Sequence, residues 1–354
     1  MSPFPAAIPN PRTPDAMDAP ALRWGLLGTG WVAERFVGAV QRRTRQNLIA
    51  VGSRNGRRSA DFGSRHGIPR CYDSYEALVD DRDVDVVYIA TTHDAHLACA
   101  RLVLEADKPV LVEKPLGLNA AQATEIAQLA AGRGLFCMEA LWTFFLPKAD
   151  IVRQILEAGT LGEVRTVLAD IGEYFTPDHR IMRPDQAGGP LLDLGTYPIS
   201  FATSVLGPPA RVLAAGQWHD TGVNAQASAI LVDQRGNQAV LHTTLLSNTP
   251  TSATIAGTDG TLMLHGPFYQ PGDLTLISAD GEQRLTFTEP ALAHDGLYFE
   301  AAEAARCISA GRLESPLRPL TDSITTMEVI DEIRRQCGIV FPVERQGVLD
   351  ERPV

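Results

Sequence analysis

Lys114 is the first residue whose type and position could do chemistry. It belongs to the motif Glu113-Lys114-Pro115, which directly follows the apolar run Val110–Val112. If that run is a strand of an open α/β sheet, Lys114 lies at the carboxyl end of the strand, where such sheets bind ligands. A fixed cation there lowers the pKa of a neighbouring hydroxyl and polarises a carbonyl. Seen alone, a solvated surface lysine is the more ordinary interpretation.

A carboxylate and a phenol follow the glycine-rich turn Gly188-Gly189-Pro190. Proline there is typical of a first helical turn, which predicts a helix that carries Asp193 and Tyr197 four residues apart on one face. The pair can orient a polyol and pass a proton, although a phenol with an ordinary pKa of about 10 needs a nearby cation such as Lys114 to serve at neutral pH. The alternative is that Asp193 only caps the helix and Tyr197 is a core aromatic.

The run Leu26–Ala33 has the pattern G-x-G-x-x-A between an apolar strand and a helical segment. Gly28 permits the sharp turn, Gly30 lets the backbone approach a pyrophosphate, and the small Ala33 allows close packing of helix on strand. The helix N-terminus then offers N–H groups and a partial positive charge to the phosphates. The pattern predicts a dinucleotide site, with a glycine-rich turn that binds nothing as the alternative.

The end of the second strand indicates which dinucleotide is bound. Where an NAD site usually has an acid about 20 residues beyond the glycines, this chain has Ser53 and Arg54, with Arg58 nearby. An acid would repel a 2′-phosphate, whereas these side chains donate hydrogen bonds to it. NADP is therefore the predicted cofactor; solvated helix-face charges at positions 57 and 58 are the alternative.

Particular elements must position these motifs. Apolar runs alternate with helical segments up to about residue 138, which predicts a parallel sheet covered by helices on both faces. The expected strands are Trp24–Leu27, Leu48–Gly52, Val84–Ala90, Pro109–Val112 and Leu135–Met138, and the expected helices are Val32–Arg43, Tyr75–Asp80, His96–Ala106 and Ala120–Ala131, the last capped by Asn119.

Beyond about residue 160, strand-like runs follow one another across tight turns at 233–236, 258–260 and 279–281, which predicts a meandering antiparallel sheet to about Phe287. Two helices follow, Leu297–Ala310 and Thr321–Cys337. The expected fold class is α/β: a Rossmann domain with a parallel sheet at 21–145, and an α+β domain with an open, mostly antiparallel sheet at 146–345, whose final helices pack back toward the first domain. Residues 1–20 are expected to form a flexible leader.

Composition argues against several classes of protein. The 354 residues carry a net charge of −11, whereas a nucleic-acid partner needs a basic surface. No apolar run reaches the roughly 18 to 20 residues of a membrane span, and the first 20 residues have no signal-peptide core. Five dispersed cysteines and the lack of metal-ligand spacing predict reduced thiols, a cytoplasmic protein and no bound metal.

The three motifs, in this order and spacing, resemble the glucose–fructose oxidoreductase/inositol dehydrogenase (Gfo/Idh/MocA) family over roughly residues 22 to 340. Many members of that family have histidine at the position of Tyr197. The tyrosine, with Thr-His-Asp-Ala-His at 92–96 and Met-Glu-Ala-Leu-Trp-Thr at 138–143, is similar to the branch of dimeric dihydrodiol dehydrogenases and NADP-linked xylose dehydrogenases. That branch often has arginine where this chain has Phe144, which removes a cation.

The resemblance implies that Lys114 and Tyr197 are the catalytic pair, that Asp193 positions the substrate, and that the bond from Lys114 to Pro115 is cis. It also implies that a homodimer forms through the open face of the second sheet, where Ala227–Val232 and Ala239–Leu245 would lie.

The resemblance further implies NADP as cofactor, with arginines at its 2′-phosphate. The expected cofactor contacts are Gly28, Thr29, Gly30, Trp31, Val32, Ser53, Arg54, Arg58, Thr91, His93, His96, Glu113, Lys114 and Trp142. Some have a second interpretation: His96 could merely open the next helix, and Trp142 could belong to an interdomain core. His179, in a polar loop before Gly188, could contact the substrate.

The leading hypothesis is reversible hydride transfer between NADP and a CH–OH group of a sugar, polyol or cyclic diol, with Tyr197 as acid or base assisted by Lys114. One alternative is an enzyme that keeps NADP tightly bound and oxidises one sugar while it reduces another. The other is a nucleotide-binding regulatory protein, against which the proton-donor set argues because a sensor needs none. Residue order does not encode the substrate, which depends on loop shape.

Overall fold

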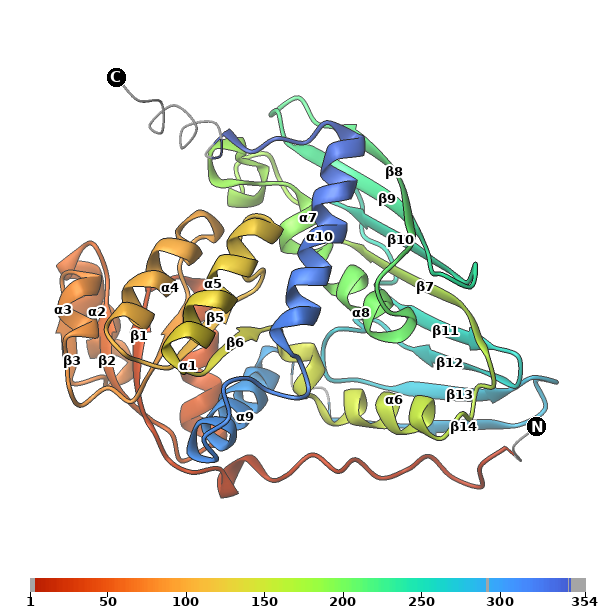
Figure 1. The fold of residues 1–354 in the computed structure, drawn as a ribbon, viewed down its shortest axis with the longest axis horizontal. Coiled ribbons are helices and arrows are strands. Elements are labelled where there is room, and N and C mark those ends of the chain that lie inside the picture. Colours follow the sequence, from red (N-terminus) through yellow and green to blue (C-terminus); the bar gives the residue numbers. More distant parts are fainter. Residues whose placement is uncertain (1–3, 291–292, 343, 345–354) are drawn as a thin grey trace. The chain divides into compact units, whose positions relative to one another are not determined.

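A computed structural model of the chain describes residues 4–290, 293–342 and 344 (Figure 1). The outermost residues of the predicted leader and of the predicted second domain, 1–3 and 345, lie outside this range. The chain divides into two compact units. We call Thr13–Leu146 with Leu292–Ile324 the Rossmann unit, and Met1–Arg12 with Pro147–Ala291 and Thr325–Val354 the second unit.

The Rossmann unit is built on a six-stranded parallel sheet in the order β3-β2-β1-β4-β5-β6. Its strands are β1 (Arg23–Leu27), β2 (Asn47–Gly52), β3 (Arg70–Tyr72), β4 (Val86–Ile89), β5 (Val110–Glu113) and β6 (Cys137–Ala140), joined by α1 (Trp31–Arg43), α2 (Gly56–His66), α3 (Tyr75–Val79), α4 (His96–Glu105) and α5 (Ala120–Arg133). This is the strand order of doubly wound dinucleotide-binding folds, whose winding reverses between β1 and β4. The predicted fold class is confirmed for this half.

Buried apolar strands form the centre of this unit. Every residue of β4, β5 and β6 is buried, as expected for parallel strands covered on both faces. Phe36 on α1 stacks on Tyr88 of β4 with ring centroids 3.9 Å apart. Asn119 caps α5 by accepting the N–H of Gln122 (2.9 Å), which confirms the predicted helix start.

Helix α2 and strand β3 are not among the predicted elements. The helix is strongly polar and turns only Ser59, Phe62 and Gly63 inward, so it lacks the apolar stripe on which a helix prediction rests. Gly63 packs so tightly that a Cβ there would lie 2.2 Å from the sulfur of Cys71 on β3. The formation of α2 and β3 at this edge of the sheet therefore depends on tertiary packing.

The second unit contains an eight-stranded sheet in the order β14-β13-β12-β11-β7-β10-β9-β8. Its strands are β7 (Val164–Gly172), β8 (Arg211–Trp218), β9 (Asn224–Val232), β10 (Gln238–Thr244), β11 (Ala253–Gly257), β12 (Gly260–Leu264), β13 (Leu274–Ser278) and β14 (Arg284–Phe287). The three predicted turns join β9 to β10, β11 to β12 and β13 to β14. The sheet is mostly antiparallel but not a simple meander, because β7 lies between β10 and β11 and pairs parallel with β10.

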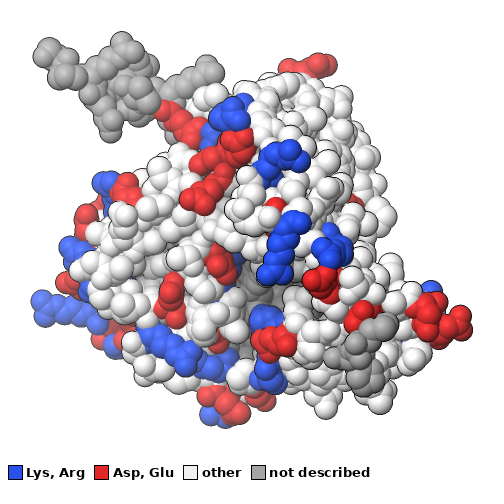
Figure 2. All heavy atoms as spheres, turned by 45° about the vertical axis from the view of Figure 1, so that its right-hand side comes forward, with Lys and Arg blue, Asp and Glu red and all other residues white. Residues whose placement is uncertain are grey.

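The two faces of this sheet differ. Helix α8 (Thr196–Leu206) packs against β7 and β10, and α7 (Pro190–Asp193) packs against β9. Residues paired directly across neighbouring strands share a face, and one row of pairs carries large exposed apolar side chains, namely Leu213, Val240, Leu168 and Met263. Figure 2 shows basic and acidic side chains interspersed, with broad uncharged areas between them.

The predicted leader makes specific contacts. In the second unit, Arg12 donates from its backbone (2.6 Å) and its guanidinium (2.8 Å) to Asp150 on α6 (Pro147–Glu157). In the Rossmann unit, Arg306 on α9 (Tyr298–Ser309) donates to the carbonyl of Asp15 (2.8 Å), and small residues pack together: Ala16, Ala19, Ala302 and Ala305. The expectation of a flexible leader disagrees with these contacts, because an ion pair and apolar packing hold residues 12–19.

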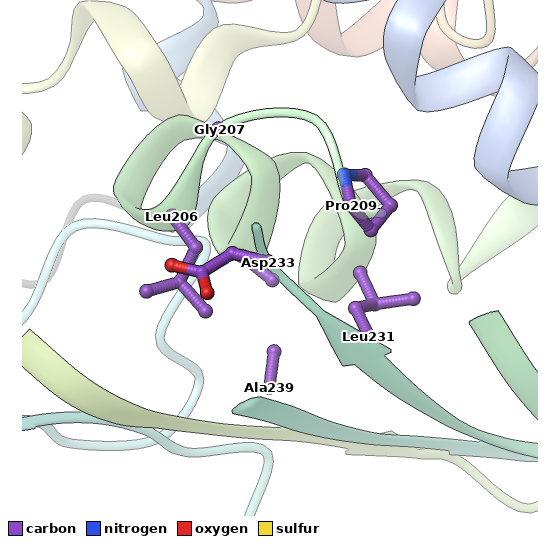
Figure 3. A pocket seen from close by; sticks show the side chains of 7 residues that line it. Leu206, Gly207, Pro209, Leu231, Asp233 and Ala239 are labelled. Atoms are coloured by element: carbon purple, nitrogen blue, oxygen red, sulfur yellow. The ribbon is translucent and has the colours of Figure 1, made fainter. Parts of the chain in front are cut away.

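A small cavity of about 10 Å³ lies between the end of α8 and strands β9 and β10 (Figure 3). It is lined by Ala202, Leu206, Gly207, Pro209, Leu231, Asp233 and Ala239. The Asp233 carboxylate is already used by the turn, where it accepts the N–H groups of Arg235 and Asn237 (both 2.8 Å). The cavity has room for about one water molecule, so it is a packing defect and not a substrate site.

Candidate active site

The carboxyl ends of the parallel strands carry the residues expected to bind a dinucleotide. Residues 28–32 follow β1, 53–58 follow β2, 91–96 follow β4, Glu113 ends β5 and Trp142 follows β6. The carboxyl ends of parallel strands share one edge of a sheet, and doubly wound folds bind ligands there. The Rossmann unit thus brings these predicted residues to a common edge.

The glycine loop has the geometry of a phosphate site. Gly28 has a φ of +105°, and a Cβ there would lie 2.4 Å from the carbonyl oxygen of Ala90, so the turn requires glycine. Gly30 precedes α1, and a Cβ there would meet nothing within 4 Å. Open space therefore faces the first N–H groups of α1, which is the arrangement that receives a pyrophosphate. The residues present fit a dinucleotide.

The end of β2 is basic. Arg54 and Arg58 are exposed, and Ser53 beside them is buried. Arg57 instead lies 3.9 Å from Asp61 with its side chain 90% exposed, so the solvated interpretation describes Arg57 well. Cations without a carboxylate at this strand end suit a phosphate better than a ribose diol.

Glu113 fixes the backbone at Lys114. One carboxylate oxygen accepts the N–H of Lys114 (3.1 Å), and the other is hydrogen-bonded to the hydroxyl of Tyr88. Burial raises the pKa of Glu113 to about 7, although the Tyr88 hydrogen bond and the Lys114 charge lower it. The bond from Lys114 to Pro115 is cis, as the resemblance implies, and the Lys114 side chain is partly buried.

His96 supports the same turn. Its Nδ1 lies 2.8 Å from the carbonyl oxygen of Pro115, and its Nε2 lies 3.4 Å from that of Thr91. Both partners are acceptors, so a neutral ring donates to only one of them, and the shorter contact is the donating one. Burial of the whole ring lowers the pKa of His96. His96 is also the first residue of α4, and His93 is buried beside it.

A buried ion pair on β6 supports the residue that follows this turn. One oxygen of Glu139 accepts the N–H of Leu116 (3.0 Å), and the other accepts from Arg318 (3.0 Å) and from the hydroxyl of Ser323 (2.6 Å). Both charged side chains are 1% exposed, and these hydrogen bonds offset the cost of removing charge from water. No sequence pattern points to Arg318, which joins β6 from 179 residues away.

Aromatic rings line part of this edge. His294 stacks on Trp142 (ring centroids 5.6 Å apart) and meets Trp31 edge-on (4.8 Å). Trp31 is 57% exposed. Burial lowers the pKa of His294. His294 was not predicted, because it comes from a short 3-10 helix, Ala293–Leu297, that lies far along the chain and has no motif around it.

In the second unit, Asp193 ends α7 and Tyr197 lies in the first turn of α8. The predicted start at Pro190 is confirmed. The chain turns between the two helices: Gly195 donates its N–H to the Pro190 carbonyl (2.8 Å), and a Cβ at Gly195 would lie 2.7 Å from the carbonyl oxygen of Leu191. This tight turn divides the predicted single helix into two, with Leu194 and Gly195 between them in the right-handed helical region.

Asp193 has an ion-pair partner that no motif indicates. Arg180 places its Nη2 2.9 Å from Asp193 Oδ1, and the Arg180 side chain is 41% exposed. His179, the predicted substrate contact in this loop, accepts the N–H of Ile181 (3.2 Å) and packs on Phe175. Within this loop, Arg180 thus contacts Asp193, the carboxylate that is expected to position the substrate.

Tyr197 stacks on Tyr269, with ring centroids 4.4 Å apart. Tyr269 lies between β12 and β13, and its hydroxyl accepts from the side-chain amide of Gln270 (3.1 Å). Burial raises the pKa of Tyr269. Sequence reasoning missed Tyr269, since an isolated tyrosine between two strands carries no signal of its own.

Within the residues that the structure describes, no group of three or more His, Cys, Asp or Glu side chains could hold a metal ion. No helix in the same ranges combines the length and the apolar character that crossing a membrane requires.

Comparison with known proteins agrees with this architecture. Residues 22–141 match the oxidoreductase family with an NAD-binding Rossmann fold, and residues 150–263 match the GFO/IDH/MocA C-terminal domain. The chain is 36% identical over 336 residues to trans-1,2-dihydrobenzene-1,2-diol dehydrogenase of Bos taurus, covering 92% of this chain and 99% of that protein. The Homo sapiens enzyme of the same name is 35% identical over 340 residues, covering 92% and 100%.

Solved structures show the same fold. A 3-ketoreductase from Actinomadura kijaniata in complex with NADP and TDP-benzene superposes with a TM-score of 0.79 at 26% identity, covering 90% of this chain and 98% of that one. A levoglucosan dehydrogenase in complex with NADH and levoglucosan has a TM-score of 0.81 at 18% identity, covering 90% and 97%, and supports the fold alone. The chain is an oxidoreductase, and it belongs to the Gfo/Idh/MocA family.

Proposed function

We propose that this chain transfers hydride between NADP and a CH–OH group of a sugar-like or diol substrate. The observation that carries the proposal is the end of β5, where Glu113, His96 and Glu139 fix the turn at Lys114 on the same sheet edge as the glycine loop. Relatives named dihydrobenzenediol dehydrogenases and a 3-ketoreductase with bound NADP support this substrate class. The nicotinamide, when bound, supplies the hydride acceptor or donor.

In this proposal the proton is moved by the chain's own residues. Tyr197 accepts the substrate hydroxyl proton during oxidation and returns it during reduction. The Lys114 cation stabilises the ionised phenol. Asp193 binds an adjacent substrate hydroxyl, and Arg180 orients that carboxylate through its ion pair. Tyr269 holds the Tyr197 ring by stacking.

The preference for NADP over NAD rests on the basic end of β2. Arg54, Arg58 and Ser53 donate to a 2′-phosphate, and no residue from 53 to 58 carries a negative charge that would repel it. All five cysteines are free, which fits a reducing cytoplasmic compartment.

We also propose a homodimer formed through the open face of the second sheet. Leu168, Leu213 and Val240 are 43% to 46% exposed on that face, and a run of exposed apolar side chains is typical of a protein interface. Leu168→Glu should give a monomeric mass in solution, whereas wild type should give a dimeric one. A monomeric wild type would contradict the dimer.

The decisive experiment is an NADP-reduction screen over aldoses, inositols and cyclic diols, with affinities for NADP and NAD measured on the same protein. NADPH formation with at least one class of substrate and tighter binding of NADP are expected. Tighter binding of NAD would contradict the cofactor assignment. Absence of turnover over the whole panel would favour a nucleotide-binding protein without catalysis.

A further inference from the structure

Glu300, in the first turn of α9 in the Rossmann unit, plays no part in the site described so far. Its side chain is 0% exposed, and within residues 4–290, 293–342 and 344 neither of its carboxyl oxygens has a hydrogen-bond partner. A buried carboxylate without hydrogen bonds is strongly unfavourable, because nothing replaces the water that it has lost. The protonated acid avoids that cost.

Glu113 is the charged group whose field acts on Glu300. The two carboxyls differ in what surrounds them. Glu113 is hydrogen-bonded to the Tyr88 hydroxyl and accepts the Lys114 N–H, and the Lys114 charge favours its ionised form. Two neighbouring buried carboxyls do not both ionise easily, and the one with hydrogen-bond donors keeps the charge.

We propose that Glu300 is a positioning residue that holds a proton in the folded protein and so leaves a single negative charge, on Glu113, behind the turn that presents Lys114. The proposal rests on the proposed role of Lys114, but its protonation step is independent of that role.

The surroundings of the pair favour one proton. Glu139 of β6 acts on Glu113 as a second negative charge and raises its pKa, whereas the Tyr88 hydrogen bond, the Lys114 charge and the Lys114 N–H all favour the ionised form of Glu113. Of the elements packed against α9, α1 and the 142–145 turn contribute buried apolar side chains, namely Phe36, Val37, Trp142 and Phe145. The segments Ala16–Asp18 and Ala293–Leu297 also pack against α9 and carry the titratable groups Asp18, His294 and Asp295. Burial is accordingly the largest cause that raises the pKa of Glu300 well above the ordinary carboxyl range.

Ionisation of Glu300 at alkaline pH has a definite consequence. A second negative charge beside Glu113 repels the first and disturbs the hydrogen bond by which Glu113 holds the Lys114 backbone N–H. The alkaline side of the activity profile should therefore carry the titration of Glu300, although this residue touches neither substrate nor cofactor.

Glu300→Gln tests the proposal, because the amide keeps the shape of the neutral acid and cannot ionise. The pKa of Glu300 is higher in the folded protein than in the unfolded chain. Wild type should therefore lose stability as the pH rises from the pKa of the unfolded chain toward that of the folded protein. The unfolding constant of wild type relative to E300Q should rise by about tenfold per pH unit over that range. Glu105→Gln, which removes an exposed carboxyl of the same unit, should show no such rise.

Two further measurements complete the test. Infrared spectra of wild type at about pH 8, well above the ordinary carboxyl pKa, should contain a protonated-carboxyl band that E300Q lacks; this band can be sought in wild type even where the variant fails to fold. The alkaline limb of the kcat profile should move to higher pH in E300Q and stay in place in E105Q. A wild type without the band, or an unchanged pH dependence of unfolding, would overturn the proposal, whereas failure of the NADP screen would leave both readouts intact.

Discussion

The two units hold their parts of the site in different ways. In the Rossmann unit, backbone geometry and buried polar side chains fix the site: Gly28 permits the loop, and Glu113, His96 and Glu139 each hold a neighbouring backbone atom of the Lys114 turn. In the second unit, Asp193 and Tyr197 lie beside a tight break between two short helices. Their partners are a half-exposed arginine and a ring from a distant loop.

This difference bears on which part of the site can change its sequence without losing its function. A site built from backbone and fully buried charges tolerates little change, which suits a cofactor that is the same for every substrate. A site built from loop side chains changes with the loops, which suits a variable substrate. Apart from Lys114 and the residues that position it, substitutions in the Rossmann unit should therefore alter stability or cofactor affinity, and substitutions at Asp193 and Tyr197 in the second unit should alter turnover.

The largest expected effect is on turnover. Tyr197→Phe should reduce kcat by about 10² to 10⁴, because the proton transfer loses its acid or base, while the affinity for NADP stays the same. Lys114→Ala should slow the same step. Tyr174→Phe, which alters an exposed tyrosine of the second unit (58% exposed), is the matched control. Steady-state kinetics together with cofactor titration separates the two effects, and unchanged kcat in Y197F would rule out its assigned role.

The next effect is on the stability of the Rossmann unit. Arg318→Met should lower the free energy of unfolding by roughly 3–5 kcal/mol, because it leaves the Glu139 carboxylate buried without its cation. Denaturant unfolding measures this loss. Arg23→Met, whose ion pairs with Asp83 and Asp85 lie at the surface, should change little. Equal losses in both variants would show that the buried network has no special role.

Arg54→Ala should weaken NADP binding by roughly 10- to 100-fold, the equivalent of one charge-assisted hydrogen bond, and leave NAD binding nearly unchanged. Arg57→Ala, which removes a side chain that lies near Asp61, should leave both affinities alone. Calorimetric titration of both variants with NADP and with NAD measures these affinities. A parallel loss of NAD affinity in R54A would show that Arg54 does not select the phosphate.

The smallest expected effect is a pH dependence in the second unit. Burial lowers the pKa of Lys148 to about 8, although Glu289 and Asp273 raise it. The unfolded chain keeps this proton up to its ordinary pKa of about 10.4, so wild type should gain about 1.4 kcal/mol of stability per pH unit between about pH 8 and pH 10. Lys148→Met should remove that gain, measured as the midpoint of denaturant unfolding at each pH. The same slope in both proteins would assign it to other groups.

Sequence reasoning recovered the elements that depend on short stretches of chain. Five of the six Rossmann strands, the Asn119 cap and the three hairpin turns could be predicted because glycine geometry, capping and apolar periodicity act over a few residues. The helix α2 could not, since Phe62 is its single large buried residue and the rest of the helix is mostly polar. The break at Gly195 was also missed, because a spacing of four residues describes a helical face only where the helix continues.

The amino-acid sequence by itself determined the glycine loop, the basic end of the second strand and the presence of Lys114, Asp193 and Tyr197, because each depends on local sterics or residue type. Only the tertiary structure decided which side chains support them. Arg318 reaches Glu139 across 179 residues of chain, and Tyr269 meets Tyr197 from another part of the sheet. Such pairs depend on how distant elements pack, and packing leaves no mark in the residues on either side.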